Sequence, residues 1–151
     1  IEFIEGQEVI SLAELESTAT RQNLKIESGD ILLVSAGRDA RRQHSGGRLN
    51  PAEGMVGLHP ECLPWFRERE IAVLGSDGIS DPLPGLGIPN WPFPIHQIGI
   101  TALGLPLIDN LALHALGAAC AESARWSFLF TLGAMRVPGA TGCPVNPIAI
   151  L

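Results

Sequence analysis

Residues 71–78, IAVLGSDG, place a short apolar run directly before a polar turn, and this pattern decides the fold class. A run of this length, closed by Gly, Ser and Asp, is typical of a strand that is buried on both faces of a sheet. Residues 29–37, GDILLVSAG, repeat the pattern with a Gly-Asp turn, four apolar residues and a closing glycine. We therefore expect two buried strands.

Helical patterns alternate with these strands along the chain. Ser11 and Glu14 form a capping-box pattern, and an apolar spacing typical of a helix follows to about Asn23. Further helices are expected at 60–70, 96–103 and 111–125, and further strands at 106–108, 126–137 and 148–151. This alternation predicts an α/β fold with a mixed sheet and flanking helices.

Two stretches between these elements are expected to be irregular. Residues 38–57 are polar and rich in Gly and Arg, and they are expected to form a long loop or lid. Residues 80–94 contain five prolines and are expected to be extended or turning. Long loops inside compact domains are often functional, so the first stretch is a candidate for covering a site.

The composition excludes several classes of protein. The 151 residues are 46% hydrophobic and 17% charged, so the chain has enough apolar material for a core and disorder is not expected. The net charge of −6 gives no electrostatic help toward nucleic acid or an anionic membrane, and neither is expected as a partner. Residues 1–5 lack the basic start and apolar core of a signal peptide.

The cysteine pattern bears on the compartment. Cys62, Cys120 and Cys143 are widely spaced and contain no CxxC pair. An odd number of separated cysteines fits reduced thiols in a cytoplasmic protein better than a disulfide framework. Each is expected to be a small hydrophobic residue of the core.

Polar side chains follow several of the expected strands. Arg38 and Asp77 come directly after the two buried strands, and Asp109 follows the short strand at 106–108. His96 opens a helix after two prolines. The carboxyl ends of strands in an open α/β sheet carry the functional groups, so these four side chains are expected to converge.

The role of the histidines stays open on residue type alone. None of the four forms an HxH or HxxxH pair, so His96 is either a structural histidine or one ligand of a divided metal site. His59, just before a proline, is either a helix-start residue or a pocket residue. Arg38, at a strand end, is the best candidate of its arginine-rich stretch for gripping a substrate carboxylate.

Several motifs resemble the cyclase family, which includes bacterial kynurenine formamidases and isatin hydrolases. The most specific are GLHPECLPW at 57–65 and RVPGATGCPVNPIA at 136–149, and the likeness extends over most of the chain, including PIHQIGITALGLPLIDNLAL at 94–113. The resemblance implies a swivelling β/β/α fold and metal-dependent hydrolysis. The main HxGTHxDxxxH-like metal motif of that family does not occur in this sequence and is expected upstream of Ile1.

The resemblance also implies roles for individual residues. Residues 1–151 are expected to be the C-terminal portion of a single cyclase-like domain, without the N-terminal half that carries the metal motif. His96 matches a later metal-ligand histidine of the family. Asp109 stands where an acidic ligand is expected, as Asp rather than Glu and one position further along. We assign no catalytic residue to this segment and expect it to be inactive alone.

The implied activity is cleavage of an amide or cyclic amide such as N-formylkynurenine, as in tryptophan catabolism, by a water activated on Zn or Mn. Arg38, His59, Asp77, Trp91 and Phe93 are the expected substrate-binding residues, and the protein is expected to form a homo-oligomer. The alternative is a non-catalytic cyclase-like scaffold or a small-molecule binding domain. An intact metal motif before Ile1 favours the hydrolase, whereas a broken one favours the alternative.

Overall fold

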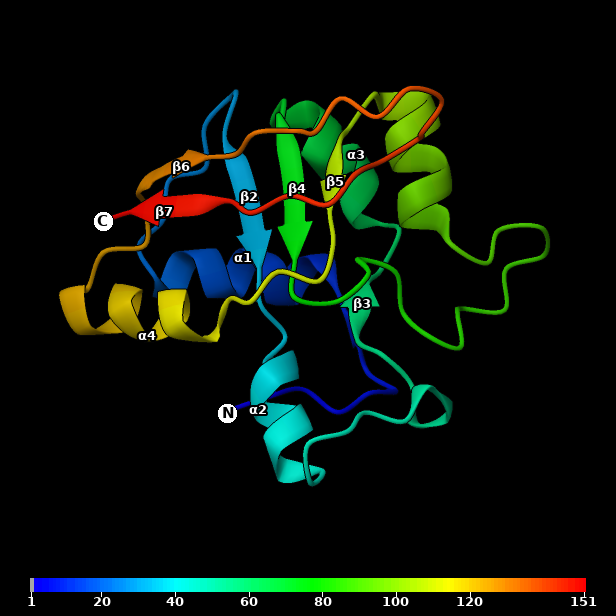
Figure 1. Ribbon diagram of the computed structural model, residues 1–151, viewed down its shortest axis with the longest axis horizontal. Helices are drawn as coiled ribbons and strands as arrows, with labels where there is room; N and C mark the ends of the chain where they lie inside the picture. Colours follow the sequence, from blue (N-terminus) through cyan, green and yellow to red (C-terminus); the bar gives the residue numbers. More distant parts are fainter. Residues whose placement is uncertain (1) are drawn as a thin grey trace.

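The central sheet of the computed structural model, which describes residues 2–151, contains three parallel strands (Figure 1). They are β2 (Ile31–Val34), β4 (Val73–Ser76) and β5 (Leu107–Ile108), in the spatial order β2-β4-β5. The register pairs Val34 with Ser76 and Gly75 with Ile108, so all three strands end at the same edge. The α/β class and the positions of both predicted strands are confirmed. β4 is largely buried, as expected, whereas all four residues of β2 are only half-buried.

Four helices surround this sheet close to their predicted positions. They are α1 (Leu12–Arg21), α3 (Cys62–Glu68), the π-helix η2 (Ile95–Leu103) and α4 (His114–Ser123). The predicted capping box of α1 is confirmed, because Ser11 accepts from the Glu14 backbone while Glu14 accepts from the Ser11 backbone. The sequence predicted a helix at η2, but not its wide π geometry.

A second pair of strands lies beside the central sheet. β1 (Val9–Ile10) and β3 (Gly57–Leu58) are parallel to each other. The fold requires a glycine at position 57, because a Cβ there would lie 2.1 Å from the backbone carbonyl carbon of Asp81. The Leu58 backbone then donates to the Ser80 carbonyl at 2.8 Å, which fixes the segment that leads into the site.

The main core lies between this sheet and the helices. Its most deeply buried side chains include Leu58, Phe66, Leu74 and Ile95, each at most 1% exposed. A smaller cluster forms around Ile108, Leu111 and Leu113, with Phe130 and Val145 packed against it. The C-terminal segment is therefore tied to the central sheet by a few apolar contacts.

The expectation of a long loop at 38–57 is wrong. Residues Arg38–His44 form helix α2, and Pro51–Glu53 form a single 3-10 turn. Gly37 stands at the N-cap with φ of 80°, a left-handed conformation that glycine adopts without strain. The carboxylate of Asp77 caps the N-terminus of the helix by accepting from the Gly37 and Arg38 backbone. Because Asp77 is distant in sequence, no local motif predicted this helix.

The long strand expected at 126–137 is also wrong. Only β6 (Leu129–Thr131) forms, and it pairs antiparallel with β7 (Ile148–Ile150). Parallel and antiparallel pairing both occur, as a mixed architecture requires, but in separate sheets. The β6–β7 ribbon formed by these two strands exposes much of its apolar surface: Leu129 is 60% exposed and Ile148 is 56% exposed. Apolarity therefore did not mean burial here.

The cysteines are free, as expected, and two of them lie in the core. Cys62 and Cys120 are buried, whereas Cys143 is half-buried. Burial, and then the nearby charge of Glu61, raise the pKa of the Cys62 thiol to about 12, which keeps it protonated and unreactive near neutral pH.

Within residues 2–151, no helix combines the length and apolarity that a membrane crossing requires.

Leu74→Ala should lower the free energy of unfolding by about 2–5 kcal/mol, because the side chain is fully buried on the central strand. Leu129→Ala is the matched control on the exposed ribbon and should change it by less than about 0.5 kcal/mol. Urea unfolding of both variants provides the measurement. Equal losses in the two variants would contradict this placement of the core.

Candidate functional site

The shared edge of the parallel strands gathers three of the predicted site residues, Arg38, Asp77 and Asp109. Asp77 follows β4, Asp109 and Asn110 follow β5, and the turn after β2 leads into Arg38. The Asn110 backbone donates to the Gly78 carbonyl at 2.7 Å, which joins the ends of β4 and β5. The expected convergence at the carboxyl ends of the strands is therefore present.

Asp77 organises the turn between β2 and α2. Its carboxylate accepts four hydrogen bonds of 2.9–3.0 Å, from the Ser35 hydroxyl and from the backbone of Ala36, Gly37 and Arg38. The residue is only 4% exposed. These contacts favour a structural part for Asp77, and its contact with a substrate stays a prediction.

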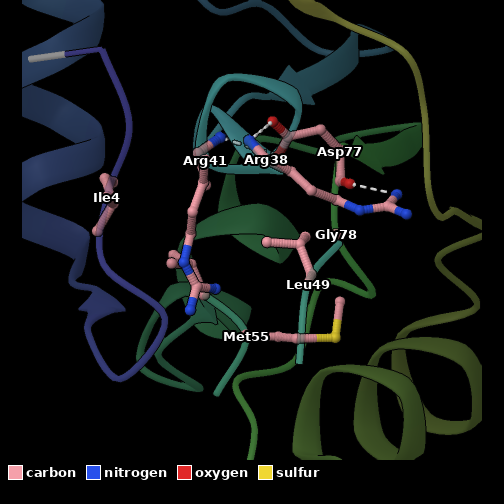
Figure 2. A pocket seen from close by; sticks show the side chains of 9 residues that line it. Ile4, Arg38, Arg41, Leu49, Met55, Asp77 and Gly78 are labelled. Carbon is pink, nitrogen blue, oxygen red and sulfur yellow. Dashed lines mark hydrogen bonds between the residues drawn. The ribbon is translucent and has the colours of Figure 1, made fainter. Parts of the chain in front are cut away.

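Arg38 reaches from α2 across the strand ends. Its Nη1 donates to the Asp77 carbonyl at 3.0 Å and to the Asn110 side-chain oxygen at 2.9 Å. Figure 2 shows this side chain extending toward Asp77, while Arg41 leaves the same helix in another direction. Arg38 is thereby held next to Asn110, the neighbour of Asp109.

His96 lies between two carboxylates. Its Nδ1 is 2.6 Å from Oδ2 of Asp81, and its Nε2 is 2.9 Å from Oδ2 of Asp109. The Asp81 side chain is fully buried, whereas the side chains of His96 and Asp109 are 32% and 26% exposed. The predicted pairing of His96 with Asp109 is present, and solvent reaches it from the Asp109 side.

Asp81 is the residue that the sequence reasoning missed. Besides the His96 ring, its carboxylate accepts from the backbone of Ile95 at 2.7 Å and of His96 at 3.1 Å. It therefore fixes the start of η2 and closes the base of the proline-rich loop. The available signal was an Asp at the second position of that loop, with His96 two residues after its end.

Two serines support the other carboxylate. The Ser80 hydroxyl donates to Oδ1 of Asp109 at 3.0 Å, and it lies 3.1 Å from the Ser76 hydroxyl. Both serines are buried. Asp109 therefore has one oxygen on Ser80 and the other on His96, which limits its rotation.

The two carboxylates favour the charged imidazolium form of His96. The hydrogen bond to Asp109, and then the one to Asp81, raise the pKa of His96 to about 9, although burial opposes them. Both ring nitrogens then donate, Nδ1 to Asp81 and Nε2 to Asp109. The ring is positively charged near neutral pH.

The remaining predicted site residues lie outside this network. His59 follows β3, and its Nδ1 accepts from the Glu61 backbone at 3.3 Å. Trp91 and Phe93 stand on the proline-rich loop and are 43% and 39% exposed. Within residues 2–151, no hydrogen bond links His59, Trp91 or Phe93 to His96, so their substrate contacts stay predictions.

Two hollows lie beside the network. The first is lined by Arg38, Arg41 and Asp77 together with apolar side chains such as Met55 (Figure 2). The second is lined by residues of β3 and β4 and includes Ser80, which donates to Asp109. His96 lines neither hollow. The first hollow is connected to the network by Arg38, which lines it and bonds to Asn110, the neighbour of Asp109.

A metal ion is implied by the family resemblance, and the donor set fits one only in part. The Asp81 carboxylate holds Nδ1 of His96, the arrangement by which a ligand histidine is usually oriented through its second nitrogen. Nε2 and Asp109 then offer two donors side by side. Within residues 2–151, no group of three or more His, Cys, Asp or Glu side chains is arranged to hold a metal ion.

The site can therefore bind a proton between His96 and Asp109, or offer those two groups to a cation. The imidazolium could also donate a proton to a neighbouring group. Arg38 adds a fixed positive charge at the same sheet edge. These capacities suit general acid chemistry and shared metal ligation, and they do not suit a nucleophilic serine or cysteine mechanism.

The titration of His96 should show a midpoint near pH 9, and Asp109→Asn should move it toward the ordinary value of 6.5. Because the folded pKa is the higher one, the stabilisation from the charged ring is complete below pH 6.5 and is lost as the pH rises through about 9. NMR of the ring protons measures the midpoint of the His96 titration. Urea unfolding below pH 6.5 and above pH 9 measures the change in stability. A wild-type midpoint near 6.5 would sink the proposed double hydrogen bond.

Asp81→Asn should lower the free energy of unfolding by about 1.5–3 kcal/mol, because a buried carboxylate that accepts three hydrogen bonds is replaced. It should also lower the pKa of His96. Asp39→Asn is the control, since Asp39 is 3.9 Å from Arg42 in a partly exposed pair worth about 0–1 kcal/mol. Similar unfolding curves for both variants would argue against a central part for Asp81.

Comparisons with known proteins agree with this architecture. A solved structure of a novel cyclase is 26% identical with a TM-score of 0.81, over 98% of this chain and 48% of that one. A second, of a potential metal-dependent hydrolase with cyclase activity, is 12% identical with a TM-score of 0.57, over 98% of this chain and 65% of that one. The second likeness concerns the fold alone.

This chain thus spans about half the length of the first structure. No curated protein gives a significant match to the sequence. A family model described as "Putative cyclase" matches residues 2–81, which ends at the buried Asp81. With that match over more than half of its residues, the chain belongs to the cyclase family.

Proposed function

We propose that this protein is a metal-dependent hydrolase that cleaves the C–N bond of an amide or cyclic amide. The observation that carries the proposal is the His96 ring, fixed by Asp81 at Nδ1 and facing Asp109 at Nε2. This is how a ligand histidine is oriented in metal sites. The cyclase family, and the fold shared with a potential metal-dependent hydrolase with cyclase activity, support it by analogy.

His96, once its Nε2 has lost its proton, and Asp109 are the residues that would hold the ion. When bound, Zn²⁺ or Mn²⁺ would supply an activated water and would polarise the substrate carbonyl. Asp81 keeps the His96 ring in one orientation, and Ser80 keeps Asp109 from rotating. Asp81 and Ser80 therefore hold Nε2 of His96 and the Asp109 carboxylate in fixed positions in the absence of a ligand.

Two donors do not complete a catalytic site, which usually takes three protein ligands and an open position. We therefore propose that further ligands come from polypeptide outside residues 2–151, in keeping with the half-length match to the cyclase structure. The segment alone is then a metal-binding half-site with little or no turnover.

A second candidate is a non-catalytic cyclase-like domain that binds a small molecule. The observation that favours it is the missing three-donor group within the described residues. In that case the charged His96 and its two carboxylates form a structural clamp, and their loss affects folding rather than metal content.

His96→Ala in a polypeptide that contains a complete cyclase domain should lower metal occupancy or N-formylkynurenine turnover by about 10–100-fold. His114→Ala is the control, because that histidine is exposed at the start of α4. Bound metal per chain, turnover and melting temperature are measured for both. Full metal content and activity with a lower melting temperature would show that His96 is structural.

A further inference from the structure

Arg38 leaves one edge of its guanidinium group unused. Among the described residues, only Nη1 of this group has hydrogen-bond partners, the Asp77 carbonyl and the Asn110 side chain. Nε is buried without a partner, and no hydrogen bond joins Nη2 to a described residue. Nε and Nη2 lie on the same edge of the planar group and present two parallel N–H donors.

The positive charge of Arg38 is also uncompensated within the part of the chain that the structure describes. The neighbouring carboxylate of Asp77 is engaged by a hydroxyl and three backbone N–H groups rather than by the guanidinium. In the same helix, Arg42 is 3.9 Å from Asp39, and Arg41 is 3.9 Å from Glu5. Arg38 alone of these three has no carboxylate partner among the described residues.

Arg38 lines a small hollow with a partly apolar wall. Ile4, Leu49 and Met55 contribute to that wall, as Figure 2 shows. The cavity volume of about 20 Å³ leaves room for one or two water-sized groups. That space suits a carboxylate head group, and the rest of the anion would lie outside the hollow. A hydrogen bond to Nε would be shielded from competing water.

We propose that Arg38 binds the carboxylate of a small organic anion through Nε and Nη2. A planar carboxylate matches the two parallel donors of an arginine edge, and such paired, charge-assisted bonds are the strong ones. The inference rests on the proposed function only in treating this anion as the substrate. In that case the substrate carries a carboxylate in addition to the amide that is cleaved.

The test titrates the protein with benzoate, in the presence of a chelator, and follows the NMR signal of the Arg38 Nε–H group. Benzamide is the neutral isostere, and inorganic phosphate is the alternative oxyanion. We expect a saturable shift with benzoate, none with benzamide, and weaker binding of phosphate. The wild-type signal decides the question even if a variant does not fold.

Arg38→Lys removes the Nε–H signal, so benzoate binding to the variants is measured by calorimetry. This substitution should weaken benzoate binding by about tenfold or more, because lysine keeps the charge but cannot offer two parallel donors. Arg42→Lys, on the same helix and 52% exposed, should leave it within about twofold. An absent Nε–H shift, equal binding of benzamide, tighter binding of phosphate, or an unaffected Arg38→Lys variant would each overturn the proposal.

The assay involves no metal and no turnover, so the two proposals can fail separately. Benzoate binding without hydrolysis in a complete domain would leave the carboxylate site standing and remove the hydrolase. Hydrolysis without benzoate binding at Arg38 would do the reverse.

Discussion

The carboxylate of Asp81 is the contact on which the candidate site depends. It is fully buried and accepts from two successive backbone N–H groups at the start of η2 and from the His96 ring. Burying a carboxylate is costly unless it is hydrogen-bonded, and these three donors meet that requirement. The same contacts close the proline-rich loop at its base, so loop geometry and ring orientation are set together. Gly57 lets β3 approach the Asp81 backbone closely enough for this arrangement.

The parallel register of the central sheet supplies the rest of the site. Since β2, β4 and β5 end at one edge, the residues that follow them meet without any long-range loop. The two carboxylates at this edge are used differently. Asp77 satisfies backbone donors of the turn before α2, whereas Asp109 stays partly exposed between Ser80 and His96. A position at a strand end thus identifies candidate site residues. Their hydrogen-bond partners then distinguish carboxylates that hold the backbone in place from carboxylates that can still bind a ligand.

The sequence predicted the parts of this molecule that depend on local pattern. Apolar runs located β2 and β4, the capping box located α1, and strand-end logic brought His96 and Asp109 together. Asp81 was missed because its partners lie beyond the proline-rich loop. Helix α2 was missed because Asp77, which caps it, is distant in the chain. The strand at 126–137 was predicted too long because its apolar residues were read as one continuous strand, whereas only Leu129–Thr131 pair with β7. Each of these errors involves residues that contact one another in the fold but are not connected by any periodic pattern in the sequence.

The charges along the sheet edge are separated in a way that bears on substrate orientation. His96 with its two carboxylates carries a net negative charge even when the ring is protonated, so a cation is favoured beside Asp109. Arg38 has no ion-pair partner among residues 2–151, and it is bonded to Asn110, the residue that follows Asp109. A bound molecule therefore meets opposite potentials at adjacent positions. A substrate with an anionic group and a reacting carbonyl would be aligned by Arg38 at one end, with its carbonyl directed toward the Asp109 side.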